Sequence, residues 1–246
     1  MIHINNLKLD EFKKDRSFVI SDFDMTITKP GSMTCWNLFA RNNIVPPELQ
    51  VCNRKLYNFY RQIEIMDDIP IYEKASSMER WAIEELNLFK KYGISKSIYD
   101  RIIKENNSMI LREDFIKFAK RLNELNIKLY IVSGGIYDVI YDTLEKNNIL
   151  LDNIDIVSNN IIFDGNEIAG FGSDIIHSCN KDMIDLPIKD YEYGLLFGDL
   201  DGDKLIGKPY NTLDIIFSNN INNNFNINLT GDSSFDDIGK LLIKKY

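Results

Sequence analysis

The sequence is poor in the residues that build disulfide frameworks and zinc sites, with three cysteines and two histidines among 246 residues. The cysteines, Cys35, Cys52 and Cys179, are odd in number and form neither a Cys-x-x-Cys pair nor a ligand spacing with histidine. We therefore expect reduced, buried thiols, as is typical of a reducing compartment. A disulfide-stapled scaffold is excluded.

Long apolar runs are missing as well. No stretch approaches the roughly 20 apolar residues of a membrane helix, and the charged first residues contain no apolar core of a signal peptide. The sequence thus predicts a cytoplasmic protein without a membrane partner.

Positive charge is in short supply, because 37 Asp and Glu outnumber 29 Lys and Arg and give a net charge of −8. Nucleic acid polymers and anionic membranes select clustered Lys and Arg, so neither is expected as a partner. A single phosphate group bound in a local pocket is compatible with this balance. The hydrophobic fraction of 44% is that of a globular protein and excludes intrinsic disorder.

Short apolar runs alternate with segments of helical spacing along much of the chain. The strand candidates are 18–20, 129–132, 195–197, 213–217 and 225–229. Apolar residues recur at helical spacing in 115–125 and 136–144, on either side of the second candidate. This alternation predicts an α/β fold with a Rossmann-like, mostly parallel sheet. The Asp-Gly-Asn sequence within 161–171 predicts a β-hairpin.

The region 30–110 has a different character, with helical patterns and little strand signal. The helices expected there are 36–40, 47–65, 72–92 and 95–106. An insertion after the first strand of an open α/β sheet stands over the carboxyl ends of the strands, where ligands bind. We therefore predict a core made of 1–29 and 111–246, and a helical cap made of 30–110.

Acidic or hydroxyl side chains follow three of the predicted strands. They are Asp22, Asp24 and Thr26 after the first, Ser133 after the second, and Asp199 and Asp203 after the third. Carboxylates gathered at one sheet edge need a cation, and Mg²⁺ prefers oxygen ligands. Asp22 and Asp24 are two residues apart, so an extended chain points both side chains the same way. One can then act as a nucleophile while the other moves protons, which suits phosphoryl transfer.

These motifs resemble those of the haloacid dehalogenase-like (HAD) phosphatases. DFDMTIT is similar to the first motif, IVSGG to the second, the lysine of HSCNKD to the third and GDLDGD to the fourth. VSNNIIFDGNEIAGF followed by IIHSCNK, with YRQIEI in the cap, further resembles the eukaryotic-type pyrimidine 5′-nucleotidases. The resemblance runs from about residue 18 to the end of the chain. It implies Mg²⁺-dependent hydrolysis of a nucleoside 5′-monophosphate through an aspartyl-phosphate.

The resemblance also implies a role for each matching residue. Asp22 is the expected nucleophile, Asp24 the expected acid and base, and Lys181 the residue that neutralises the phosphoryl charge. The expected substrate-binding residues are Thr26, Ser133, Gly134 and, toward the nucleobase, Glu64. The expected metal ligands are Asp22, Asp24 through its carbonyl, Asp199 and Asp203. The sequence departs from the family at Tyr137, where a glycine is usual and where the ring could narrow the pocket, and at Glu85, where a substrate-binding serine is usual.

The residues themselves leave several alternatives open. Ser133 can be the N-cap of the helix that follows it. GDSSFD at 231–236 spells a second fourth motif, with Lys208 as its upstream lysine, although Asp232 is expected instead to cap a last helix at 236–245. Trp81 can pack in the cap or stack on a base.

The function leaves alternatives open too. The substrate can be phosphoserine, a sugar phosphate or a thiamine or pyridoxal phosphate, and an inactive binding protein is the rival of another class. A small phosphorylated metabolite is the expected partner in either case, bound by a monomer or a dimer.

Overall fold

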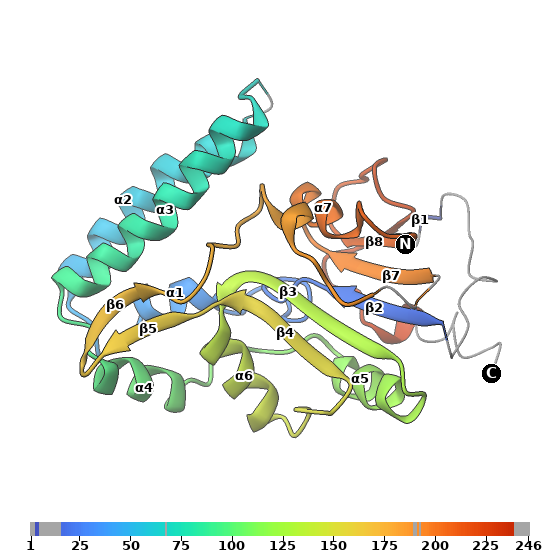
Figure 1. Cartoon of the computed structure of the whole chain (residues 1–246), viewed down its shortest axis with the longest axis horizontal. Coiled ribbons are helices and arrows are strands. Elements are labelled where there is room, and N and C mark those ends of the chain that lie inside the picture. Colours follow the sequence, from blue (N-terminus) through green and yellow to red (C-terminus); the bar gives the residue numbers. More distant parts are fainter. Residues whose placement is uncertain (1–2, 5–15, 67, 189–190, 192, 239–246) are drawn as a thin grey trace.

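The computed structural model of the chain describes residues 3–4, 16–66, 68–188, 191 and 193–238. Within this part a seven-stranded sheet has the order β1-β9-β8-β7-β2-β3-β4 (Figure 1). All neighbouring strands run parallel except β1, which pairs antiparallel with β9 at one edge. The strands are β1 (His3–Ile4), β2 (Ser17–Ser21), β3 (Lys128–Ile136), β4 (Ile154–Asn159), β7 (Tyr193–Gly198), β8 (Thr212–Phe217) and β9 (Ile227–Leu229).

Side chains of the central strands alternate between two apolar layers. Val19 of β2 packs into the larger layer, which includes the buried faces of α5 (Phe115–Glu124) and α6 (Tyr137–Lys146). Its neighbours Phe18 and Ile20 pack into the smaller layer on the other face, which includes α7 (Lys204–Gly207). Figure 1 shows α5 and α6 on one side of the sheet and α7 on the other. Because both faces are covered, the strands consist of continuous apolar runs.

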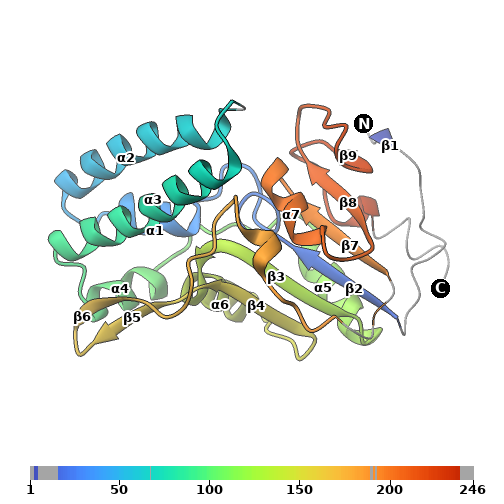
Figure 2. The same ribbon diagram turned by 45° about the horizontal axis from the view of Figure 1, so that its top comes forward.

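Five helices lie between β2 and β3 in the described part of the chain, and the first four form the predicted insertion. These four are α1 (Cys35–Ala40), α2 (Pro47–Ile65), α3 (Ile71–Lys91) and α4 (Lys96–Lys104). Thr34 and Ser95 cap α1 and α4 by accepting hydrogen bonds from backbone N–H groups of the first turn. A proline begins α2, where the missing N–H costs nothing. In Figures 1 and 2, α2 and α3 lie side by side and project past the carboxyl ends of the central strands.

The short helix α4 and a β-hairpin connect this helical region to the core. Tyr99 of α4 donates a hydrogen bond to Asp138 of α6 at 2.9 Å. The hairpin of β5 (Ile161–Asp164) and β6 (Glu167–Phe171) meets the start of α4, where the N–H of Lys96 donates to the carbonyl of Asn166. None of the helices in the described part of the chain combines the length and apolarity that crossing a bilayer requires.

The α/β class, the parallel sheet and the four inserted helices are confirmed. The hairpin predicted within 161–171 is present as β5 and β6. The sequence pattern misses β1, which is two residues long, and β4, whose side chains are mostly half-buried at the opposite edge. The boundaries drawn at 30 and 110 stay a prediction, as does the last helix at 236–245, most of which lies outside the described residues.

Candidate active site

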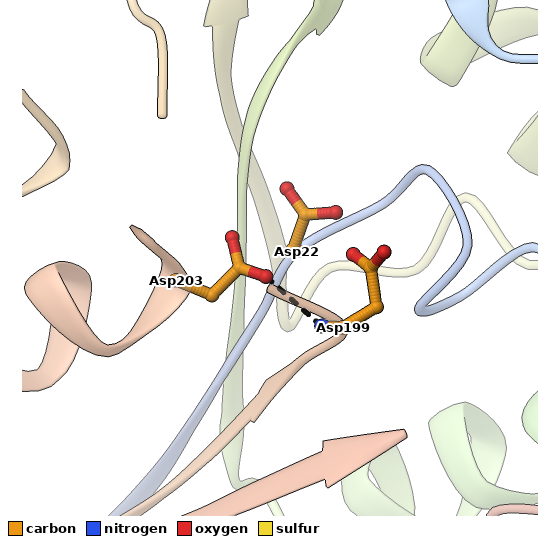
Figure 3. Close-up of side chains that lie close together, drawn as sticks. All are labelled: Asp22, Asp199 and Asp203. Atoms are coloured by element: carbon orange, nitrogen blue, oxygen red, sulfur yellow. Dashed lines mark hydrogen bonds between the residues drawn. The ribbon is translucent and has the colours of Figure 1, made fainter. Parts of the chain in front are cut away.

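The strand register brings the predicted acidic residues together. Ser21, the last residue of β2, pairs with Ile131 of β3 on one side and with Phe197 of β7 on the other. The N–H of Asp22 then donates to the carbonyl of Phe197 at 2.9 Å. Asp22 therefore emerges beside the ends of β3 and β7. Figure 3 shows Asp22, Asp199 and Asp203 converging from the ends of β2 and β7 and from the turn after β7.

A buried lysine links two of these carboxylates. The Nζ of Lys181, in the short 3-10 helix η2 (Lys181–Met183), lies 2.6 Å from Oδ1 of Asp22 and 2.7 Å from Oδ1 of Asp203. Asp203 belongs to η3 (Asp201–Asp203), and its Oδ2 accepts hydrogen bonds from the N–H groups of Asp199 and Leu200 at 2.9 Å each. Asp203 thus fixes both the lysine and the turn that presents Asp199.

The cluster holds more negative charge than one lysine neutralises. One carboxylate oxygen from each of Asp22, Asp199 and Asp203 can be chosen so that all lie within 4.8 Å of one another. Burial raises the pKa of Asp22 to about 7, although the ammonium of Lys181 acts in the opposite direction. Burial, then the carboxylates of Asp203 and Asp22, raise the pKa of Asp199 well above its usual value. An all-oxygen donor set with excess negative charge fits a hard divalent cation.

Asp24 is held separately from this cluster by the first residue of α1. The N–H of Cys35 lies 3.1 Å from both carboxylate oxygens, and its Sγ lies 3.5 Å from Oδ1. Burial raises the pKa of Asp24 to about 6, and the hydrogen bond from the N–H of Cys35 lowers it in part. Burial and then the Asp24 carboxylate also raise the pKa of the Cys35 thiol well above its usual value, so the sulfur keeps its proton.

Ser133 and Gly134 lie at the end of β3 and line the same cavity as Asp22. The Oγ of Ser133 accepts a hydrogen bond from the N–H of Gly135 at 3.0 Å. The carbonyl of Gly134 accepts hydrogen bonds from the indole of Trp36 and the amide of Asn159, which fix the orientation of this loop. Ser133 does not cap α6, because the N-cap position is Ile136 and carries no side-chain hydrogen bond. The capping alternative is therefore wrong.

Thr26 contacts the carboxylate of Asp199. Its side chain is fully buried, and its hydroxyl donates to Oδ1 of Asp199 at 3.3 Å. It is not among the residues that line the cavity. Thr26 therefore supports the carboxylate of Asp199 in this geometry, and its contact with substrate stays a prediction.

The strand ends and the α2–α3 hairpin enclose a cavity of about 520 Å³. Such a volume is within the roughly 300–1,000 Å³ that hold small-molecule ligands. Asp22, Lys181 and Asp199 lie on its core side, and Glu64 lies on its cap side. Glu64 accepts hydrogen bonds from Arg61 and, at 2.6 Å, from the hydroxyl of Ser178 in the loop before Lys181. Glu64 on the α2–α3 side and the loop before Lys181 are thus in direct contact.

Further along the hairpin, the cap wall is aromatic and acidic. Glu85 is 6% exposed and accepts a hydrogen bond from Asn53 across the hairpin. Burial raises the pKa of Glu85 to about 7, and the Asn53 contact lowers it in part. Trp81, one turn before Glu85, stacks on Tyr60 at 5.9 Å between ring centroids. Its indole N–H is buried without a hydrogen-bond partner, although Trp81 lines the cavity. The ring therefore packs in the cap and still faces the cavity.

The competing motif lies outside this cavity. Asp232 is exposed, and Lys208 contacts Asp182 at 3.2 Å with its side chain 67% exposed. Near the start of the predicted last helix it is Ser234 that accepts a hydrogen bond from the N–H of Asp236. The structure therefore supports GDLDGD, not GDSSFD, as the fourth motif.

Two further expectations, on Tyr137 and on the cysteines, need correction. Tyr137 stacks on Tyr141 and does not line the cavity, so it does not narrow it. Cys35 is buried as expected, but Cys52 and Cys179 are partly exposed, and all three are free thiols. A larger cavity, about 1010 Å³, runs along α5 and contains none of the predicted site residues.

The sequence did not predict the residues that contact the loops of the site on the side away from the cavity. Cys35 contacts Asp24 and Trp36 contacts Gly134. Ser178 contacts Glu64, and the buried Arg112 donates to the carbonyls of Met25 and Thr26. The one local signal for the first pair is their position just after the capping residue Thr34, close to the first motif. The other contacts join residues far apart in the chain, which no local pattern shows.

Comparison with known proteins gives the family. The family model for pyrimidine 5′-nucleotidase (UMPH-1) matches residues 20–239, most of the chain. The chain belongs to the pyrimidine 5′-nucleotidase family. As a member of this family it is an enzyme, a phosphatase of the HAD type.

Named relatives of this pyrimidine 5′-nucleotidase family member come from several animals. A 7-methylguanosine phosphate-specific 5′-nucleotidase A of Xenopus laevis is 32% identical over 213 residues, which cover 80% of this chain and 72% of that protein. The 7-methylguanosine phosphate-specific 5′-nucleotidase of Homo sapiens is 32% identical over 176 residues, which cover 68% of this chain and 57% of that protein.

Solved structures agree on the fold. Cytosolic 5′-nucleotidase IIIB bound to cytidine superposes with a TM-score of 0.82 at 24% identity, covering 99% of this chain and 94% of that one. A substrate-bound phosphoserine phosphatase superposes with a TM-score of 0.63 at 18% identity, covering 94% of this chain and 100% of that one. The core is thus shared by HAD phosphatases that differ in substrate.

Proposed function

We propose that this protein hydrolyses nucleoside 5′-monophosphates in the cytoplasm, with Mg²⁺ and through an aspartyl-phosphate. The observation that carries the proposal is the contact of Lys181 with both Asp22 and Asp203, beside Asp199, at the bottom of a cavity closed by the α2–α3 hairpin. A buried, positioned carboxylate with a cation beside it is the arrangement that nucleophilic attack on phosphorus requires.

The chain's own residues then have distinct tasks. A carboxylate oxygen of Asp22 forms a bond to phosphorus as the bond to the nucleoside 5′-oxygen breaks, and Asp24 gives that oxygen its proton. Asp24 next takes a proton from the water that attacks the phosphoenzyme. Lys181 neutralises Asp22 and the phosphoryl oxygens, while Ser133 and the N–H of Gly134 bind those oxygens.

The metal has a matching donor set. Asp22, Asp199, Asp203 and the carbonyl of Asp24 are the groups that would hold Mg²⁺. The bound ion would supply charge neutralisation at the phosphoryl oxygens.

Replacing Asp199 tests this assignment of the metal ligands. We expect Asp199→Asn to raise the Mg²⁺ concentration for half-maximal activity by about ten- to a hundredfold, because a ligand charge is lost. Asp232→Asn, in the exposed competing motif, is the matched control and is expected to leave that concentration unchanged. Titration of turnover with Mg²⁺ gives both values. If the Mg²⁺ concentration for half-maximal activity rises in Asp232→Asn and stays unchanged in Asp199→Asn, the assignment of the metal ligand is reversed.

The cap favours a base that offers hydrogen-bond donors or positive charge. Glu64 and Glu85 supply carboxylates, and Trp81 supplies an aromatic face, the combination that binds cationic rings. The relatives are named 7-methylguanosine phosphate-specific 5′-nucleotidases. Their names support a cationic base for this chain too, because 7-methylguanine carries a positive charge. The cytidine found in the structural neighbour supports a pyrimidine as well.

A panel of phosphomonoesters tests the substrate class. We expect kcat/KM for the 5′-monophosphates of 7-methylguanosine and cytidine to exceed that for GMP, phosphoserine and pyridoxal phosphate by at least about tenfold. Glu64→Gln should raise KM for the preferred nucleotide. It should leave KM for p-nitrophenyl phosphate nearly unchanged, because that substrate has no base. Equal rates across the panel would remove the nucleotidase assignment and leave a general phosphatase.

A further inference from the structure

We propose that the thiol of Cys35 is a positioning group which, beside the backbone N–H of the same residue, holds the acid–base carboxyl group of Asp24 toward the leaving oxygen of the substrate. The proposal rests on the role given to Asp24 in the proposed function. Cys35 itself is fully buried and is not part of the cavity wall, so it is not placed to touch a substrate.

The contacts fix the plane of the Asp24 carboxyl group. The N–H of Cys35 is equidistant from Oδ1 and Oδ2, at 3.1 Å each, and the thiol adds a third contact to Oδ1 at 3.5 Å. All three come from the buried side, whereas Asp24 is partly exposed and lines the cavity. Asp24 is therefore held from behind while it faces the space where a substrate would bind.

The sulfur also fills a gap that the backbone of β3 leaves for it. A Cβ built on Gly135 would lie 2.7 Å from Sγ of Cys35 and 3.1 Å from Oγ of Ser133. The glycine therefore lets the thiol sit between Asp24 and the Ser133 loop. The next residue, Trp36, donates its indole N–H to the carbonyl of Gly134 at 2.9 Å. The first turn of α1 thus contacts both the acid–base loop and the loop of Ser133.

This position predicts an effect that depends on the leaving group. A nucleoside leaves as an alkoxide, a strong base, so the breaking P–O bond needs the proton of Asp24 as the Asp22–phosphorus bond forms. p-Nitrophenolate is a stable anion and leaves without a proton. A misplaced Asp24 should therefore slow release of a nucleoside far more than release of p-nitrophenolate, whereas general damage to the site would slow both.

Single-turnover reactions with enzyme in excess over substrate measure this step directly. For Cys35→Ala we expect nucleoside release from cytidine 5′-monophosphate to slow about tenfold, and p-nitrophenolate release to stay within about twofold of wild type. Cys35→Ser, which loses similar volume but keeps a donor, should recover nucleoside release to within about threefold. Cys52→Ala is the control for a thiol removed elsewhere, and thermal melting checks that each variant is folded.

The outcomes separate the inference from the function on which it rests. Equal slowing of both substrates in Cys35→Ala, or no slowing of either, would overturn the role of the Cys35 thiol alone, as would a Cys35→Ser variant no better than Cys35→Ala. A wild-type enzyme that releases neither leaving group would overturn the proposed function, and the role of Cys35 with it.

Discussion

Asp22→Asn is expected to lose about four to six orders of magnitude in turnover of both p-nitrophenyl phosphate and nucleotides. An amide cannot take part as the nucleophile, and the remaining binding groups sustain only residual catalysis. The fold should be retained, because the substitution keeps the shape and removes one negative charge from a crowded buried cluster. Steady-state rates on the purified variant, with its melting temperature, give the result.

Asp201→Asn is the matched control for that variant. Asp201 lies in the same GDLDGD turn between Asp199 and Asp203, but its side chain is exposed and contacts Asn222. We expect wild-type turnover from it. An Asp22→Asn enzyme that hydrolyses p-nitrophenyl phosphate as fast as wild type would show that Asp22 is not the nucleophile.

Lys181→Met is expected to lower turnover about a thousandfold or more and to destabilise the metal-free protein by about 3–5 kcal/mol. The large effect arises because removing one partner of a buried ion pair leaves its carboxylates uncompensated. Lys181 is 5% exposed and contacts Asp22 and Asp203, which are as deeply buried. Added Mg²⁺ should restore part of the stability, but not the activity.

The variant should also show a characteristic pH dependence. In the wild type, burial already raises the pKa of Asp22 from 3.8 to about 7, and Lys181 opposes that rise. Without the lysine the pKa rises further, so the folded state binds a proton that the unfolded state releases. Stability then falls as pH rises, and the difference between wild type and variant should be larger at pH 8 than at pH 6.

Lys208→Met provides the comparison for the lysine. Its side chain is largely exposed and its ion pair with Asp182 is on the surface, so a change within about 0.5 kcal/mol is expected. Thermal unfolding at the two pH values without metal, together with turnover, measures both variants. A Lys181→Met protein as stable and active as Lys208→Met would contradict the role of the buried lysine.

The sequence allows the prediction of residues whose chemistry follows a strand end. Asp22, Ser133 and Asp199 are visible because short apolar runs stop just before them, and parallel strands bring such ends to one edge of the sheet. The edge strand β4 is not predicted from the sequence, because its half-buried side chains make no continuous apolar run.

Contacts between distant segments could not be predicted in the same way. Trp36 and Gly134 are 98 residues apart, and Asn53 and Glu85 meet only because α2 and α3 lie side by side. Thr26 matches a substrate-binding motif position, yet the turn after Asp24 rotates its hydroxyl toward Asp199. The backbone geometry of this turn, not the residue type, decides that Asp24 lines the cavity and Thr26 does not.

The most direct test of the account is to locate the phosphoryl group on the enzyme during turnover. Wild-type protein with Mg²⁺ and a nucleoside 5′-monophosphate, quenched in acid within milliseconds and mapped by mass spectrometry, should carry a phosphoryl mass on the peptide that contains Asp22. Asp22→Asn should carry none. A phosphoryl group on another residue, or none during active turnover of the wild type, would contradict the proposed attack by Asp22.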